Sequence, residues 1–202
     1  MHFLKKINKG ALLSAIVLIG VIIYLVAVSI NNNAQKPKLK SLSEEFINKY
    51  SELMELPEEL QDNTKKITDK QIQDYEKKVK AELDAYYPKD YINISVSDLV
   101  SNLTTSNEMN IRIINADKNI KSYNFIFDGN SVKIDMEVEN TIDYINSEGI
   151  KSSFVDTYND SINFIKENGE WKVVYYLSFM SADYLNNATN GNMYNDTYIY
   201  AY

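Results

Sequence analysis

An uninterrupted apolar run near the N-terminus constrains this chain more than any other feature. Residues 11–30, ALLSAIVLIGVIIYLVAVSI, contain no charged side chain. A helix rises about 1.5 Å per residue, so a run of this length spans the roughly 30 Å hydrocarbon layer of a bilayer. The sequence therefore predicts that the chain contacts the membrane through a transmembrane helix over residues 11–30.

The lysines that flank this run predict its orientation. Lys5, Lys6 and Lys9 precede it within residues 1–10, and such lysine-rich flanks favour the cytoplasm. Three more lysines follow within residues 31–40, but a short N-terminal tail is held inside more easily than a large domain. We expect a single-pass protein of the cell membrane, with a cytoplasmic N-terminus and an extracytoplasmic C-terminal domain.

A cleaved signal peptide is the alternative interpretation. Ala27 and Ser29 have the spacing of small residues that a signal peptidase recognises. The apolar run is longer than a usual signal core and continues through Ile30, which favours a retained anchor. Residues 31–40, NNNAQKPKLK, are polar and include Pro37, so they are predicted to form a linker.

The absence of cysteine and the position of histidine limit the possible chemistry. The chain has no cysteine, and its one histidine is His2. Disulfides, thiolate chemistry, and histidine bases or metal ligands in the domain are therefore excluded. The segment 128–130, Asp-Gly-Asn, lacks the spacing of a calcium loop, and no glycine-rich phosphate loop is present. We expect no catalytic, metal-binding or cofactor-binding residues.

The charge balance argues against nucleic acid as a partner. Lys5, Lys6 and Lys9 account for three of the 21 basic residues, which leaves 18 against 28 acidic ones, a net charge of −10. Arg112 is the only arginine, so bidentate recognition of phosphates or bases is nearly unavailable.

The domain is predicted to span residues 41–180, and its first part has the apolar periodicity of two helices. Ser41 and Glu44 fit a capping box, and Thr68 with Gln71 offers a second. Apolar residues recur at helical spacing after each, up to Pro57 and Pro88. The two predicted stripes are Leu42, Phe46, Tyr50, Leu53 and Leu56, and then Ile72, Tyr75, Val79, Leu83 and Tyr86.

The period then changes to that of strands. A short strand is predicted over 91–96 and a short helix over 97–103. Turns at Gly129, Gly149 and Gly169 separate alternating segments. The predicted strands of this meander are 109–115, 120–127, 131–146, 151–166 and 171–180. The predicted fold class is α+β, with the helices packed inside a curved antiparallel sheet as a cone.

The last hairpin carries a resemblance to a known family. Residues 164–173 read FIKENGEWKV, and this ending resembles the pattern K-x-x-G-x-W-K-V of the nuclear transport factor 2-like, cystatin-like superfamily. The resemblance covers about residues 42–179 and implies that Trp171 closes the cone. With its N-terminal anchor, the chain also resembles the bitopic inner-ring subunits of conjugative type IV secretion channels. Those subunits present such a domain outside the membrane as an assembly platform.

The same superfamily includes enzymes such as ketosteroid isomerase, which place a carboxylate base and a tyrosine or histidine in the mouth of the cone. Without histidine, the remaining version here combines Asp135 or Asp156 with Tyr144 or Tyr158. Strand alternation places Asp135 on the polar face. Asp156 shares the parity of inward apolar residues, so an inward carboxylate is possible there.

Two further segments are candidates for protein contact. The last predicted strand is apolar on both faces, so Val174, Tyr176 and Met180 are predicted to form an interaction face. The tail at residues 181–202 is rich in Tyr and Asn, and it is predicted to be disordered or to order against a partner or a sheet edge.

Three functional hypotheses follow. The first is a membrane-anchored, non-catalytic protein-interaction module of a cell-envelope assembly, in particular a conjugative, type IV secretion-like channel subunit, which contacts other protein subunits or self-associates. The second is an anchored or secreted binding module for a small molecule or peptide, with an immunity or regulatory role. The third is an isomerase-like enzyme that uses the Asp and Tyr pair.

Overall fold

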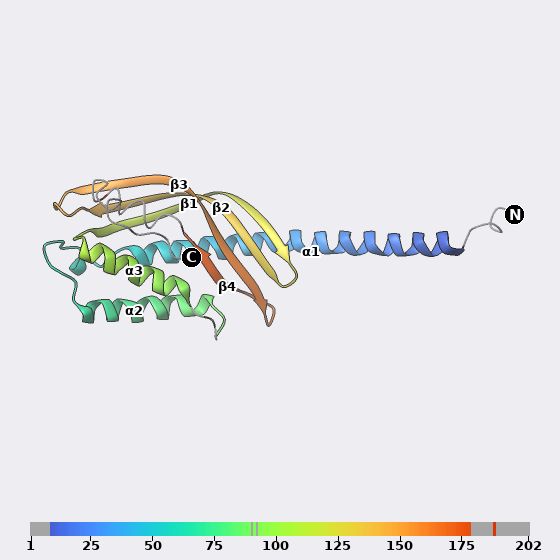
Figure 1. Cartoon of the computed structure of the whole chain (residues 1–202), viewed down its shortest axis with the longest axis horizontal. Helices are drawn as coiled ribbons and strands as arrows, with labels where there is room; N and C mark the ends of the chain where they lie inside the picture. Colours follow the sequence, from blue (N-terminus) through green and yellow to red (C-terminus); the bar gives the residue numbers. More distant parts are fainter. Residues whose placement is uncertain (1–8, 90, 92, 179–187, 189–202) are drawn as a thin grey trace, which may run out of the picture. The chain divides into compact units, whose positions relative to one another are not determined.

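The computed structural model describes residues 9–89, 91, 93–178 and 188, and it divides into two compact units, residues 1–39 and 40–202. Within the described residues, three α-helices and two short 3-10 helices precede four antiparallel strands (Figure 1). The predicted α+β class is confirmed.

Helix α1 (Lys9–Met54) contains the apolar run. Every side chain from Leu13 to Ile30 is exposed. In the described part of the chain, α1 is the one helix that is long and apolar enough to cross a membrane. Exposed apolar side chains over this length are what a lipid environment requires, so the helix fits membrane anchoring.

The predicted linker at 31–40 is helical instead, because α1 continues through it with Pro37 inside the helix. Ala34, Gln35 and Lys36 are good helix formers, and one proline removes a single helical hydrogen bond. Ser41 therefore lies in the interior of α1 and does not cap it, so the first predicted capping box is wrong.

Helix α2 (Asp69–Leu83) begins as predicted. Thr68 accepts a hydrogen bond from the backbone N–H of Gln71, and the Gln71 side chain accepts one from the backbone N–H of Thr68. Tyr75, Val79 and Leu83 bury one face of the helix. The 3-10 helices η2 (Glu58–Leu60) and η3 (Asp84–Tyr86) flank this element.

Helix α3 (Ile94–Glu108) replaces the strand predicted at 91–96. The side chain of Asn93 accepts a hydrogen bond from the N–H of Val96 and caps the helix. Val96, Leu99 and Leu103 are buried at helical spacing, and this period outweighs the brief alternation before it.

The sheet follows the order β1 (Arg112–Asp128), β2 (Ser131–Ile145), β3 (Lys151–Glu167) and β4 (Glu170–Leu177). The prediction of two strands at 109–115 and 120–127 is wrong, because β1 is continuous with register shifts between Ile113 and Asn115 and between Ile120 and Ser122. Each shift changes which residues face inward, so alternation is interrupted without a turn.

The predicted turns are confirmed. Gly129, Gly149 and Gly169 have φ angles of 55°, 80° and 86°. At the β3–β4 turn, Asn168 also has a positive φ of 50°, so both central residues of the two-residue hairpin have the left-handed conformation of a type I′ turn.

The core of the second unit lies between the helices and one face of the sheet, where α2 and α3 lie (Figure 1). Phe46, Val138, Ile134 and Phe164 are no more than 1% exposed. Trp171 is 7% exposed, as predicted for the residue that closes the hairpin against the core.

The last strand differs from its predicted alternation. Phe164 pairs with Val173 and Asn163 with Tyr175, so Val174 is the extra residue of a bulge. The inward positions before the bulge include Val173, whereas after it Tyr176 faces inward. Tyr176 is 5% exposed, and the prediction that it lies on an exposed interaction face is wrong. Val174 is half-buried, and Met180 lies outside the described residues.

Candidate functional site

A group of buried and half-buried polar side chains lies between the inner face of the sheet and the helices. We call it the buried polar cluster, and it consists of Lys118 on β1, Asp160 on β3, Tyr176 on β4, Ser178 just after β4, Tyr50 on α1 and Asp98 on α3. The side chains of Lys118 and Asp160 have no exposed surface.

The ammonium of Lys118 has three oxygen acceptors. Its Nζ lies 3.1 Å from Asp160 Oδ2, 3.0 Å from Tyr176 Oη and 2.7 Å from Ser178 Oγ. Tyr176 in turn donates its hydroxyl proton to Asp160 Oδ2 at 2.8 Å. An ammonium has three protons to donate, so each of them has an acceptor here.

Aromatic rings enclose the same ammonium. Its Nζ lies 5.7 Å from the centroid of the Tyr50 ring and 5.5 Å from that of the Tyr176 ring. The two rings meet edge to face with centroids 5.0 Å apart. The Tyr50 hydroxyl donates a short hydrogen bond to Asp98 Oδ2, which connects α1 to α3. Helices and strands therefore converge on one charged group.

Burial shifts the pKa values of the cluster. Desolvation lowers the pKa of Lys118, and the attraction of Asp160 opposes that effect. Burial raises the pKa of Tyr50 and Tyr176 well above the ordinary value. The pKa of Asp98 is also raised by burial, against the opposing hydrogen bond from Tyr50.

The cluster holds the strands together but is closed to a substrate. A catalytic lysine needs a free amine in contact with the reacting group, whereas this ammonium is saturated and enclosed. Its side chain lies on β1 and its acceptors on β3 and β4, so it links strands that are separated by β2. The arrangement is suited to fixing the position of the strands.

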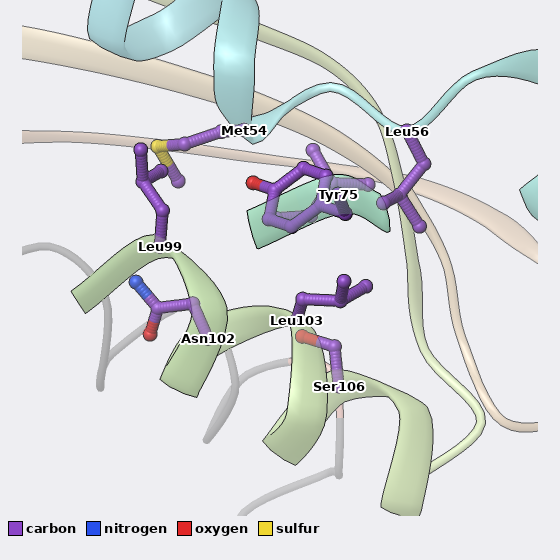
Figure 2. A pocket seen from close by; sticks show the side chains of 8 residues that line it. Met54, Leu56, Tyr75, Leu99, Asn102, Leu103 and Ser106 are labelled. Carbon is purple, nitrogen blue, oxygen red and sulfur yellow. The ribbon is translucent and has the colours of Figure 1, made fainter. Parts of the chain in front are cut away.

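A cavity between the helices and the sheet has room for about one water molecule. It measures about 10 Å³ and lies between α2, α3 and the end of α1 (Figure 2). The Tyr75 hydroxyl at its wall donates to the backbone oxygen of Leu53 at 2.6 Å. Its lining residues are Met54, Leu56, Tyr75, Leu99, Asn102, Leu103, Ser106 and Ile113. A metabolite-sized ligand does not fit there.

An open polar groove lies beside the cluster, lined by residues of α1 and β1 that include Glu44, Asn48, Asp117 and Asn119. Glu44 accepts a hydrogen bond from Tyr123 at 2.8 Å and lies 3.8 Å from Lys40. The groove measures about 330 Å³ and is open to solvent, so it does not provide the low-dielectric environment that catalysis by carboxylates requires.

The predicted Asp and Tyr candidates are separated from the buried cluster. Asp135 faces outward and pairs with Lys133 at 2.8 Å. Asp156 is exposed, although its parity is inward, and it accepts a hydrogen bond from Tyr158 at 3.3 Å. Tyr144 is 3% exposed. The structure brings Asp156 and Tyr158 together at the surface, where Asp156 is exposed and Tyr158 is half-buried.

Metal ligation has no candidate in the described ranges. Those residues contain no group of three or more His, Cys, Asp or Glu side chains placed to hold an ion. The single arginine is structural: Arg112 is fully buried and donates to the backbone oxygen of Lys65 at 2.7 Å and to Asn107 Oδ1 at 3.2 Å.

Sequence reasoning missed Lys118 and Asp160 for different reasons. Lys118 fell in the gap between two predicted strands that are one strand in the structure. Asp160 shares the parity of Ile162 and Phe164, and this inward position was the available signal. A carboxylate on the apolar face of a strand requires a buried partner, and that partner comes from a distant strand.

Comparisons with known proteins return little. No protein-family model matches the chain, and no curated protein matches it. Among solved structures, it is similar to the crystal structure of the intermembrane space region of chloroplast protein ARC6. That similarity covers 52% of this chain and 89% of the other, with 12% sequence identity and a TM-score of 0.31.

Proposed function

We propose that this chain is a membrane-anchored, non-catalytic protein-interaction module of a cell-envelope assembly. The assembly we favour is a conjugative, type IV secretion-like channel, with the second unit as a nuclear transport factor 2-like platform outside the membrane. In this proposal the N-terminus is cytoplasmic, because Lys5, Lys6 and Lys9 precede the apolar helix.

The observation that carries the proposal is the filled interior of the domain. Enzymes and ligand carriers with a cone-shaped fold need an open mouth that leads to an inner pocket. Here the cavity between the helices and the sheet measures about 10 Å³, the larger groove beside α1 and β1 is open to solvent, and the buried ammonium of Lys118 is saturated by protein oxygens. A filled cone on a membrane anchor favours a scaffold whose outer surface performs the function.

The test is complementation of a donor cell that lacks this protein, with transfer of a conjugative element as the measurement. The full chain should restore transfer. A chain that carries residues 31–202 behind a cleavable export signal should not restore it, because an unanchored platform does not concentrate at the membrane. Normal transfer without the protein would rule out the conjugative assignment.

A double variant, Asp156→Asn with Tyr158→Phe, distinguishes the interaction-module hypothesis from the enzyme hypothesis. These side chains are exposed or half-buried and bond to each other, so the fold should tolerate the change. The double variant should restore transfer as well as the full chain does. A folded double variant that fails would favour the enzyme hypothesis.

A further inference from the structure

The open polar groove beside α1 runs along the outer edge of β1, the first strand of the sheet. Its wall on β1 consists of four consecutive residues, Asp117, Lys118, Asn119 and Ile120. Consecutive side chains of a strand point to opposite faces of the sheet, so four residues in a row line one groove along the backbone edge. The Lys118 side chain has no exposed surface, so this residue contributes its backbone to the groove.

The backbone along this groove has groups available for pairing. Just before the groove, Ala116 N–H points to the edge and donates to Glu55 Oε1 at 3.1 Å. Backbone groups of a strand point alternately to its two sides, so Lys118 and Ile120 present their N–H and C=O groups to the same edge. Within the described residues, no strand or loop backbone bonds to these groups on that side. The register shift between Ile120 and Ser122 ends this regular stretch.

An edge of this kind pairs with an extended peptide, because each available N–H and C=O then gains a partner. The second wall of the groove is helix α1, which contributes Glu44 and Asn48. A peptide strand beside β1 therefore places alternate side chains toward α1 and the others along the outer face of the sheet. The groove measures about 330 Å³, which leaves room for those side chains.

The charges of the groove select the side chains that it accepts. The exposed charged residues on its two walls are Glu44 and Asp117, both acidic. Glu44 lies 3.8 Å from Lys40, which is itself half in solvent, and Asp117 forms no ion pair within the described ranges. The amides of Asn48 and Asn119 line the same groove and are exposed. This set complements a lysine or arginine side chain and repels a carboxylate.

We propose that this edge of β1 binds an extended segment of a partner protein as an added strand, with basic side chains beside Glu44 and Asp117. The backbone of Lys118 and Ile120 provides the ladder, and the two carboxylates provide the preference for positive charge. The inference rests on the proposed role of the chain as an interaction module, and it names the chemical class of partner that this module recognises.

Hydrogen exchange of the purified full-length chain in detergent tests the proposal. The probe is a short blocked peptide of threonine and lysine, with lysines at two successive positions so that both faces of an added strand carry one. Saturating peptide should slow exchange of the Lys118 and Ile120 amides roughly tenfold or more, because both then donate to the peptide. Residues 151–157 of β3, which β4 does not pair with, are the internal comparison and should exchange as before.

Two control peptides separate the ladder from the charge. Glutamate in place of lysine keeps the backbone but reverses the charge, so this peptide should bind at least roughly tenfold more weakly. Methylation of the peptide's backbone nitrogens removes its donors, so this peptide should protect neither amide. Equal binding of the lysine and glutamate peptides, protection by the methylated peptide, or protection of residues 151–157 in place of Lys118 and Ile120 would overturn the proposal. So would the absence of protection by the lysine peptide.

A double variant, Glu44→Gln with Asp117→Asn, tests the carboxylates directly. Both side chains are exposed, so the fold should tolerate the change, and affinity for the lysine peptide should fall roughly tenfold. The matched control is Glu137→Gln with Glu148→Gln, which removes two exposed carboxylates outside the groove and should bind as the original chain does. Equal losses in both double variants would show attraction by net charge alone and overturn the proposal.

These measurements use purified protein and a synthetic peptide, so they are independent of the transfer assay. A chain that binds the lysine peptide at β1 but does not support transfer would contradict the conjugative assignment and leave the edge site intact. A chain that supports transfer but shows no protection of Lys118 and Ile120 would contradict the edge site alone.

Discussion

At the scale of single residues, Lys118 and Asp160 form an ion pair in which both side chains are fully buried. Both side chains are removed from water, so each charge would be strongly unfavourable alone. Together with the hydroxyls of Tyr176 and Ser178 they form a saturated network. Removal of either partner should therefore be far more damaging than the loss of a surface ion pair.

Lys118→Met should lower the free energy of unfolding by about 3–5 kcal/mol, because it leaves the Asp160 carboxylate buried without its counter-ion. Urea unfolding of the full chain in detergent measures the change. The matched control is Lys133→Met, which breaks an ion pair with Asp135 whose lysine side chain is 49% exposed. That variant should change stability by no more than about 1 kcal/mol, and equal losses would contradict the interpretation.

Buried tyrosines should make the domain sensitive to alkali. Burial raises the pKa of Tyr87 to about 12, against an ordinary value of 10.0. Between these two values the folded form keeps the Tyr87 proton while the unfolded chain releases it. The contribution of Tyr87 to the free energy of unfolding is therefore fully present below pH 10 and is lost as the pH rises toward 12. Lys118 has a lowered pKa and opposes this trend below pH 10.5.

Tyr87→Phe isolates that contribution. The difference in unfolding free energy between the original chain and the variant should be constant below about pH 9 and should fall steadily above pH 10. Urea titrations at a series of pH values measure it. A difference that does not depend on pH would mean that Tyr87 ionises equally in both states.

At the scale of elements, β4 shows how one extra residue in a strand reverses which of the following side chains face inward. The bulge at Val174 turns Tyr176 inward and places its ring 5.5 Å from Phe46 and 5.0 Å from Tyr50. Alternation read from the sequence gives the correct parity for Trp171 and Val173 but the opposite parity for Tyr176. The sequence contains no signal for a bulge at this position. The inward orientation of Tyr176 therefore follows from its burial in the folded domain and not from alternation.

Tyr176→Asp should therefore destabilise the domain by roughly 3–5 kcal/mol, because it removes a buried ring and adds a carboxylate next to Asp160. Tyr175→Asp is the neighbouring control on the outer face, where the side chain is half-buried. Thermal unfolding of both variants should give a large shift for the first and a small one for the second. The reverse order of the two shifts would contradict the assignment of Val174 as the bulge residue.

The same elements show what the sequence could and could not predict. Capping by Thr68, the glycine turns and the burial of Trp171 are local properties, and all were predicted. The strand predicted at 91–96 was wrong because helical packing of α3 outweighs local alternation. The buried polar cluster could not be predicted, because its members come from five distant elements that only the folded topology brings together.

At the scale of the whole molecule, the apolar part of α1 and the folded domain should stay in one chain after export. Mass spectrometry of the mature protein from membranes should find the intact apolar run at residues 11–30. Protease added to cells whose outer layers have been removed should digest the domain, since it is expected outside the cytoplasmic membrane. A mature N-terminus at Ile30, or a protected domain, would contradict this topology.

Because the Lys118 side chain is enclosed, its chemical labelling can show whether the domain is folded. Reagents that acylate amines act on accessible, neutral amino groups, so they should label surface lysines such as Lys133 rapidly and spare Lys118 while the domain is folded. The fraction of molecules labelled at Lys118 would then equal the fraction that has unfolded globally. Peptide mass spectrometry after a brief labelling pulse could report, in intact cells, what fraction of this anchored domain is folded.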